Sequence, residues 1–201
     1  ILETAKANGL DYPYFQPKSK LSDECFVRGE VRVISVSLVS GQAPFFLDAV
    51  PVPGSTNEMG VFPEVLASLL KHWKQCGLFD LVSVDAGSVS KDHAEAVDQA
   101  GLLYLMAAKG SQQELHSELV RQLGYGDSAC ADFRLEERYQ GHRVVSSIWV
   151  TDKIAGWNDW QHLRMGLRVE RRTFNPGKPD THEDRYFVTN AAPSRLTPKQ
   201  W

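Results

Sequence analysis

Two short apolar segments, residues 78–84 (LFDLVSV) and 102–108 (LLYLMAA), constrain the fold of this chain more than any other feature. Each has the length of one strand and is mostly apolar on both sides, which is typical of a strand buried on both faces of a sheet. Between the two segments, Ala94 and Val97 lie on one side of a helix that ends at Gly101. The strand–helix–strand order predicts an α/β fold in which helices cover a sheet.

The residues before these segments predict a hairpin followed by a helix. Apolar and polar side chains alternate over residues 31–39, turn-forming residues follow at 40–44, and residues 45–52 make a second strand with prolines at its end. Residues 55–58 (STNE) then supply N-cap candidates before an apolar pattern that indicates a helix ending near Gly77.

The rest of the chain is richer in strands. After one more helix over residues 112–123, the patterns predict strands at 133–140, 143–150, 167–174 and 185–190. We therefore expect three regions: an irregular lead-in at 1–30, the sheet-and-helix core at 31–124, and a β-rich insertion subdomain at 125–201. Because the chain starts with Ile rather than Met and ends in LTPKQW, at the first turn of a helix, we expect a fragment of a longer protein.

Charge and hydropathy exclude several classes of protein. The 22 Lys and Arg against 25 Asp and Glu give a net charge of −3, so the molecule as a whole does not attract nucleic acid or anionic lipid. Residues 151–201 nevertheless carry nine Lys or Arg and six Asp or Glu, so a polyanion would meet this local basic region. No apolar run reaches the roughly 18 residues of a membrane span, and the three cysteines are far apart. These features predict a cytoplasmic protein without a membrane partner.

Asp85 and Lys109 are the polar residues best placed for chemistry. Each directly follows one of the buried apolar strands, and α/β proteins build their sites at the carboxyl ends of such strands. The alternative for Asp85 is that it only forms the turn before the next helix. Lys109 by itself, without Asp85 at the same edge, would not indicate a site.

An aromatic and basic set follows in the C-terminal region. It consists of Trp157, Trp160, His162, Arg164, Arg168, Arg171 and Arg172. Arginines bind phosphate oxygens and aromatic rings stack on unpaired bases, so Arg164, Arg168, Arg171 and Arg172 are candidate DNA contacts. The alternative is a strand with a solvated charged face and two tryptophans in the core.

The order of these segments resembles that of a known family. The hairpin VRVISVSLVSGQAPFFLDAVPV is followed by NEM and PEVL, then by LFDLVSVDAG, LLYLMAAKGSQ, LRVERR and RYFVTNAAPSRLTPKQW. Each motif is weak alone, but five in this order are difficult to obtain by chance. Over most of residues 31–201 the chain is similar to the catalytic domain of DDE transposases of bacterial insertion sequences, in the group with DGK, ADA and HWxxEN segments.

The resemblance implies a ribonuclease H-like fold, a mixed sheet flanked by helices with a β-rich insertion. Asp85 in VDAG corresponds to the second catalytic aspartate in the family's ADA segment, residues 109–112 correspond to KGNQ with Ser111 in place of Asn, and Asn57 and Glu58 correspond to the NE of the first helix. In this family three carboxylates hold two Mg²⁺ (or Mn²⁺) ions for phosphoryl transfer on DNA, because these hard cations prefer oxygen ligands. The implied partners are DNA at the transposon ends and, in the intact transposase, further copies of the protein.

Two of the three carboxylates have no matching motif. The chain has no DGK segment, so we expect the first aspartate to precede Ile1, with Asp11 as the internal alternative, and the chain ends before the position of the family's glutamate. We therefore expect metal-dependent DNA cleavage and strand transfer in the intact protein, but none by this fragment. The alternatives are a remnant that binds DNA without catalysis, a decayed gene product without function, and a small-molecule α/β protein, which the lack of a Gly-rich nucleotide loop disfavours.

Overall fold

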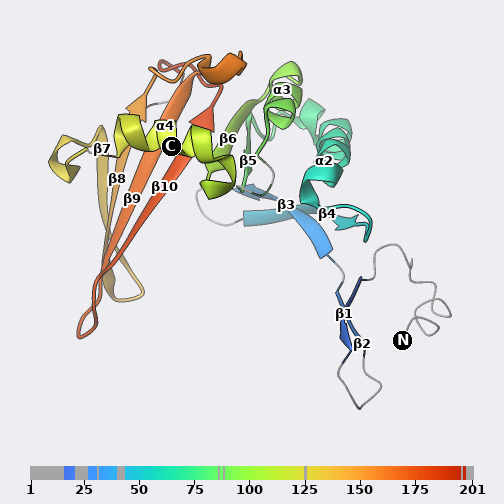
Figure 1. Ribbon diagram of the computed structural model, residues 1–201, viewed down its shortest axis with the longest axis horizontal. Coiled ribbons are helices and arrows are strands. Elements are labelled where there is room, and N and C mark those ends of the chain that lie inside the picture. The colour runs from blue at the N-terminus through green and yellow to red at the C-terminus, as the bar shows by residue number, and fades with distance from the viewer. Residues whose placement is uncertain are drawn as a thin grey trace. The chain divides into compact units, whose positions relative to one another are not determined.

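The computed structural model describes residues 16–20, 27–30, 32–39, 44–85, 87, 89–124, 126–195 and 197 (Figure 1). Compact packing divides the chain into a first unit, Ile1–Phe79, and a second unit, Asp80–Trp201, and each is considered by itself. In the described part of the chain, no helix combines the length and the apolar character needed to cross a bilayer.

A short antiparallel pair lies in the first unit, within the segment expected to be an irregular lead-in. It consists of β1 (Gln16–Lys20) and β2 (Val27–Glu30), and its register shifts between Pro17 and Ser19. The segments QPKSK and VRGE carry no alternation of apolar and polar residues, so the sequence offers no strand pattern for this pair.

The hairpin expected after it is confirmed. β3 (Arg32–Val39) pairs antiparallel with β4 (Pro44–Val52). Arg32 at the start of β3 also donates from Nη2 to the Thr56 carbonyl oxygen at 2.6 Å, which ties the chain after the hairpin back to its first strand.

The expected helix is confirmed as α2 (Glu58–Trp73), which continues into the 3-10 helix η2 (Lys74–Cys76). The Asn57 side chain caps α2 by accepting the Gly60 N–H at 3.1 Å. Three buried valines join this helix to the hairpin: Val52, Val61 and Val65.

The second unit is built on one six-stranded mixed sheet with the strand order β5-β6-β10-β9-β8-β7 (Figure 1). β5 and β6 run parallel, and the other neighbouring pairs are antiparallel. The strands are β5 (Leu81–Val84), β6 (Leu103–Ala108), β7 (Phe133–Tyr139), β8 (His142–Thr151), β9 (Met165–Phe174) and β10 (Thr181–Thr189). A mixed sheet flanked by helices confirms the expected fold class and is consistent with a ribonuclease H-like fold.

β10 joins the C-terminal strands to the α/β part of this sheet. It pairs antiparallel with β6 on one side, with Tyr186 opposite Ala108, and with β9 on the other side. Just past the end of β10, the Asn190 side chain extends the link by accepting the Tyr104 N–H at 2.8 Å. The strands of the β-rich region expected at 125–201 therefore lie in the same sheet as β5 and β6.

Two helices accompany the sheet. α3 (Lys91–Gln99) connects β5 to β6, and the Ser90 side chain caps it by accepting the His93 N–H at 3.1 Å. α4 (Gln113–Leu123) follows β6. Short 3-10 helices are also present: η4 (Gly110–Gln112), η5 (Ser128–Cys130) and η6 (Trp157–Asp159).

α4 packs on one face of the sheet, which we call the α4 face. Gly166 of β9 permits the close approach, because a Cβ atom there would lie 2.5 Å from Cδ2 of the buried Leu119. Side chains alternate along a strand, so Arg168 lies on the α4 face with Gly166, while Leu167 and Arg171 lie on the other face, which we call the reverse face.

Arg168 fastens the C-terminal end of α4 to the sheet. Its side chain is buried, and its Nη1 donates to the carbonyl oxygens of Leu123 at 3.1 Å and Gly124 at 3.2 Å. Its Nε donates to Asp184 Oδ1 at 2.7 Å, and its guanidinium carbon lies 4.5 Å from the centroid of the Trp149 ring. The last carbonyls of a helix lack partners within the helix and carry partial negative charge, so a cation there stabilises the end of α4.

The packing of α4 predicts the cost of truncating its buried leucine. Leu119→Ala should lower the free energy of unfolding by about 3 kcal/mol, because it removes a fully buried side chain and leaves a cavity against Gly166. Leu135→Ala is the matched control, since Leu135 is 42% exposed. Urea unfolding followed by circular dichroism measures both, and equal losses for the two variants would contradict this packing.

The contacts of Arg168 predict that its substitution destabilises the fold more than substitution of Arg171 on the same strand. Arg168→Gln should lower the free energy of unfolding by about 3 kcal/mol, because it leaves Asp184 and the α4 carbonyls without their cation. Arg171→Gln, on the same strand but exposed, should change it by less than about 0.5 kcal/mol. Similar values in the same unfolding experiment would show that Arg168 does not hold α4.

Candidate functional site

Asp85 directly follows the last residue of β5, and its side chain is exposed. Its Oδ1 accepts the Gly87 N–H at 3.0 Å, a turn that fixes the carboxylate at the carboxyl end of the strand. The second carboxylate oxygen has no hydrogen-bond donor in the described part of the chain. A hard oxygen ligand is therefore available to a cation at this position.

Lys109 follows β6, the parallel neighbour of β5. The register pairs Val84 with Met106, so Asp85 and Lys109 stand at the same edge of the sheet. The Lys109 N–H donates to Gln112 Oε1 at 3.2 Å, and the Gln112 N–H donates to the Lys109 carbonyl oxygen at 2.9 Å. This turn leaves the Lys109 side chain exposed. The structure thus brings these two expected site residues to one edge.

Asp85 and Lys109 also share a face of the sheet. Ala107 pairs with Phe187, and Phe187 pairs with Leu167 of the reverse face. Lys109 lies two residues beyond Ala107, and Asp85 is level with Ala107 in the continued β5–β6 register. Continuing the alternation of side chains past the two strand ends assigns both residues to the reverse face.

The four arginines expected to contact DNA do not lie together. Arg164 and Arg171 are exposed, and Arg171 lies on the reverse face. Arg172 lies on the α4 face and donates from Nη2 to Glu170 Oε1 at 2.8 Å. Arg168 is buried, and its guanidinium bonds to protein groups.

The two tryptophans of the aromatic set have different surroundings. Trp160 is buried, and its ring centroid lies 6.4 Å from that of Tyr104, whose pKa is raised by burial. Trp157 is partly buried and lines a cavity of about 560 Å³ together with the starts of α3 and α4. Lys91 at the start of α3 donates from Nζ to the Asn158 carbonyl oxygen beside this cavity.

The described part of the structure assigns no functional contact to two other residues that were singled out in the sequence. Asp11, the internal alternative for the first aspartate, lies outside the described residues. Asn57 acts as the N-cap of α2, which accounts for an asparagine at that position without any further role.

Glu170, His182 and Asp184 offer three groups that could hold a metal ion, with ligand atoms within 4.8 Å of one another. His182 Nε2 lies 2.9 Å from Glu170 Oε1, but Arg172 also bonds Glu170 and Arg168 bonds Asp184. Two arginines therefore balance the two carboxylates, and a divalent cation would have to displace them. This cluster is an ion-pair network on the α4 face, whereas Asp85 lies at the carboxyl edge on the reverse face.

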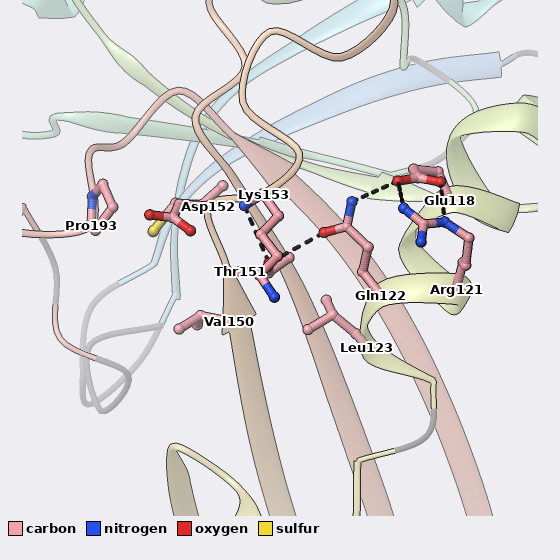
Figure 2. Close-up of a pocket in the computed structure, with 10 residues that line it drawn as sticks. Glu118, Arg121, Gln122, Leu123, Val150, Thr151, Asp152, Lys153 and Pro193 are labelled. Atoms are coloured by element: carbon pink, nitrogen blue, oxygen red, sulfur yellow. Dashed lines mark hydrogen bonds and ion pairs between the residues drawn. The ribbon is translucent and has the colours of Figure 1, made fainter.

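A pocket of about 690 Å³ lies between α4 and the end of β8 (Figure 2). Its polar side chains bond to one another: Glu118 accepts from Arg121 and Gln122, each at 2.6 Å, and Thr151 donates to Gln122 Oε1 at 3.2 Å. The bonds from Arg121 and Gln122 lower the pKa of Glu118 to about 2. None of the residues that line this pocket comes from β5 or β6, so it is separate from the edge that holds Asp85.

Two charged residues of β10 were missed in the sequence. Arg185 donates from Nε to Glu183 Oε1 at 2.8 Å, and Glu183 stands opposite Arg171 in the β9–β10 register. Pairing the segments LRVERR and RYFVTN as antiparallel neighbours would have placed Arg185 near Arg171, but the sequence alone does not fix that register.

Comparison with known proteins agrees with this architecture. Residues 32–199 match the family described as "Transposase DDE domain". The chain is also 29% identical over 148 residues to an "Uncharacterized protein in dhlA 3'region" of Xanthobacter autotrophicus, which covers 69% of this chain and 46% of that protein. The chain thus spans about half the length of this curated relative. Since the family match extends over well more than half of the sequence, the chain belongs to the transposase DDE domain family.

Proposed function

We propose that this chain is part of the catalytic region of a transposase that cuts and rejoins the DNA ends of its own insertion sequence, with Asp85 as one metal-ligating carboxylate. The observation that carries the proposal is the position of Asp85, exposed at the carboxyl end of β5, beside Lys109 at the end of the parallel strand β6. Membership of the DDE transposase family supports the reaction class.

The donor chemistry at Asp85 fits Mg²⁺ or Mn²⁺. The Asp85 carboxylate is a hard oxygen ligand for these ions, and its second oxygen accepts no hydrogen bond from the described residues. The cluster of Glu170, His182 and Asp184 fits less well, because it includes an imidazole nitrogen and two neutralising arginines. We therefore assign the metal role to Asp85.

The residues at this edge have separate tasks in the proposed reaction. Bound Mg²⁺ ions would supply activation of water or a 3′-hydroxyl and stabilisation of the leaving oxygen. Asp85 would hold such an ion, and Lys109 would bind a phosphate of the DNA from the neighbouring strand end. In the intact transposase, DNA at the transposon ends and further copies of the protein are the proposed partners.

A complete site of this class needs three carboxylates, and the family motifs assign only Asp85 within the described residues. We therefore propose that this chain alone does not cut DNA, since an incomplete ligand set weakens metal binding. The exposed cations favour a second candidate function, DNA binding without catalysis, which strong salt dependence of binding would support.

The metal role predicts a difference between two aspartates at opposite ends of β5. Asp85→Asn should weaken Mn²⁺ binding by about tenfold or more, because it removes a ligand oxygen. Asp80→Asn should leave binding unchanged, since Asp80 precedes the other end of β5 and its side chain is 82% exposed. Titration of Mn²⁺ followed by the electron paramagnetic resonance signal of the free ion measures both.

Equal Mn²⁺ binding by the two variants and the unsubstituted chain would overturn the assignment of Asp85. Incubation of the unsubstituted chain with Mn²⁺ and supercoiled plasmid tests the proposed lack of cleavage. Nicked product that disappears in Asp85→Asn would show that the chain is catalytically competent, and would keep Asp85 in the site.

A further inference from the structure

A cluster of three cations surrounds one carboxylate on the reverse face of the sheet. Arg185 donates to Glu183 at 2.8 Å, and Arg171 lies opposite Glu183 on the neighbouring strand. The hydrogen bond from Arg185 and the charges of Arg185, Arg171 and Lys109 together lower the pKa of Glu183. The cluster therefore keeps an excess of two positive charges at neutral pH.

The three cations follow the order of the strands. Lys109 ends β6, Arg185 lies on β10 and Arg171 on β9, and these strands are consecutive neighbours in the sheet. Strands lie about 4.8 Å apart, so β6 and β9 are about 10 Å apart, the axial length of about three phosphates on one DNA strand. Asp85 stands at the end of β5, the next strand beyond β6.

The surface beside the two arginines is hollowed rather than filled. A pocket of about 260 Å³ on the reverse face is lined by Arg171, Glu183 and Arg185 together with Ser146 of β8 and apolar side chains of β6, β9 and β10. Glu183 and Arg185 are well exposed, with side-chain exposures of 52% and 62%. An exposed ion pair contributes at most about 1 kcal/mol, so a competing anion can separate it.

The sheet offers an internal comparison. On the α4 face, Glu136 of β7 accepts from Arg143 at 2.7 Å, and Arg134 and Arg138 also lower its pKa. This second cluster also has three cations and one carboxylate. It lies on β7 and β8, at the opposite edge of the sheet from β5. Charge alone therefore does not distinguish the two clusters, whereas their position relative to Asp85 does.

We propose that Lys109, Arg185 and Arg171 form a cationic track for the sugar-phosphate backbone of DNA, leading across the reverse face to Asp85, and that Glu183 occupies the place of a phosphate when DNA is absent. The inference rests on the proposed function. Arginine binds carboxylate and phosphate through the same planar fork, so the Arg185 geometry seen with Glu183 suits a phosphate equally. Glu183 then competes with DNA for these cations.

Paired arginine substitutions on the two faces test the track. Arg171→Gln with Arg185→Gln should reduce the slope of log K against log salt by about 2, one for each lost phosphate contact. Arg134→Gln with Arg138→Gln removes the same charge from the α4 face and should leave the slope unchanged. Fluorescence anisotropy of a labelled DNA duplex of arbitrary sequence, over about 50 to 200 mM KCl, measures both.

The outcomes separate the inference from the proposed function. If the unsubstituted chain shows no salt-dependent DNA binding, the proposed function fails and the track fails with it. The chain could instead bind DNA while both double variants reduce the salt slope equally, or while only the α4-face variant reduces it. In either case the track is wrong while DNA binding stands. Melting curves for each variant show whether a loss reflects unfolding.

A gain of affinity tests the role of Glu183 and cannot arise from misfolding. Glu183→Gln should strengthen duplex binding several-fold, because it removes the anion that competes for Arg171 and Arg185. Glu136→Gln is the matched control on the α4 face and should leave duplex binding unchanged. Unchanged or weaker binding by Glu183→Gln, or an equal gain in both variants, would overturn the role assigned to Glu183.

Discussion

The antiparallel pairing of β10 with β6 is the contact on which the second unit depends. It joins a parallel strand pair with its helices to four long antiparallel strands, and the Asn190 side chain extends it past the end of β10. Without this pairing, the arginines of β9 and β10 would belong to a separate sheet. With it, Lys109, Arg185 and Arg171 become neighbours across three consecutive strands.

The alternation of side chains along β9 decides what each of its arginines can do. Arg168 and Arg171 are three residues apart on β9, so alternation turns them to opposite faces. On the α4 face, Arg168 meets helix carbonyls and Asp184 and becomes part of the core. On the reverse face, Arg171 stays exposed beside Glu183. The same residue type thus has a structural task on one side and is available to a ligand on the other.

Local patterns in the sequence predicted the elements but not the long-range pairing. The β3–β4 hairpin, α2, α3 and β6 lie where the apolar periodicities place them, because such periodicity reflects burial of one side of an element. The same reasoning placed Asp85 and Lys109 at one edge, since both follow parallel strands. The pairing of Tyr186 with Ala108 leaves no local pattern, so the position of Arg185 near Lys109 and Arg171 was not predictable from local periodicity, although the family resemblance implied a mixed sheet.

Glu183 shows how a cationic surface can be stable before its ligand arrives. Like charges on adjacent strands repel, and Glu183 offsets this repulsion by standing opposite Arg171 and bonding Arg185. Because the pair is exposed, its contribution to stability is small and exchanging the carboxylate for a phosphate costs little. Glu136 offsets the same repulsion among the arginines of β7 and β8. Of these two clusters, the one on the reverse face leads to the strand end that carries Asp85, so its position in the sheet, rather than its charge, is the basis of the proposed role in DNA binding.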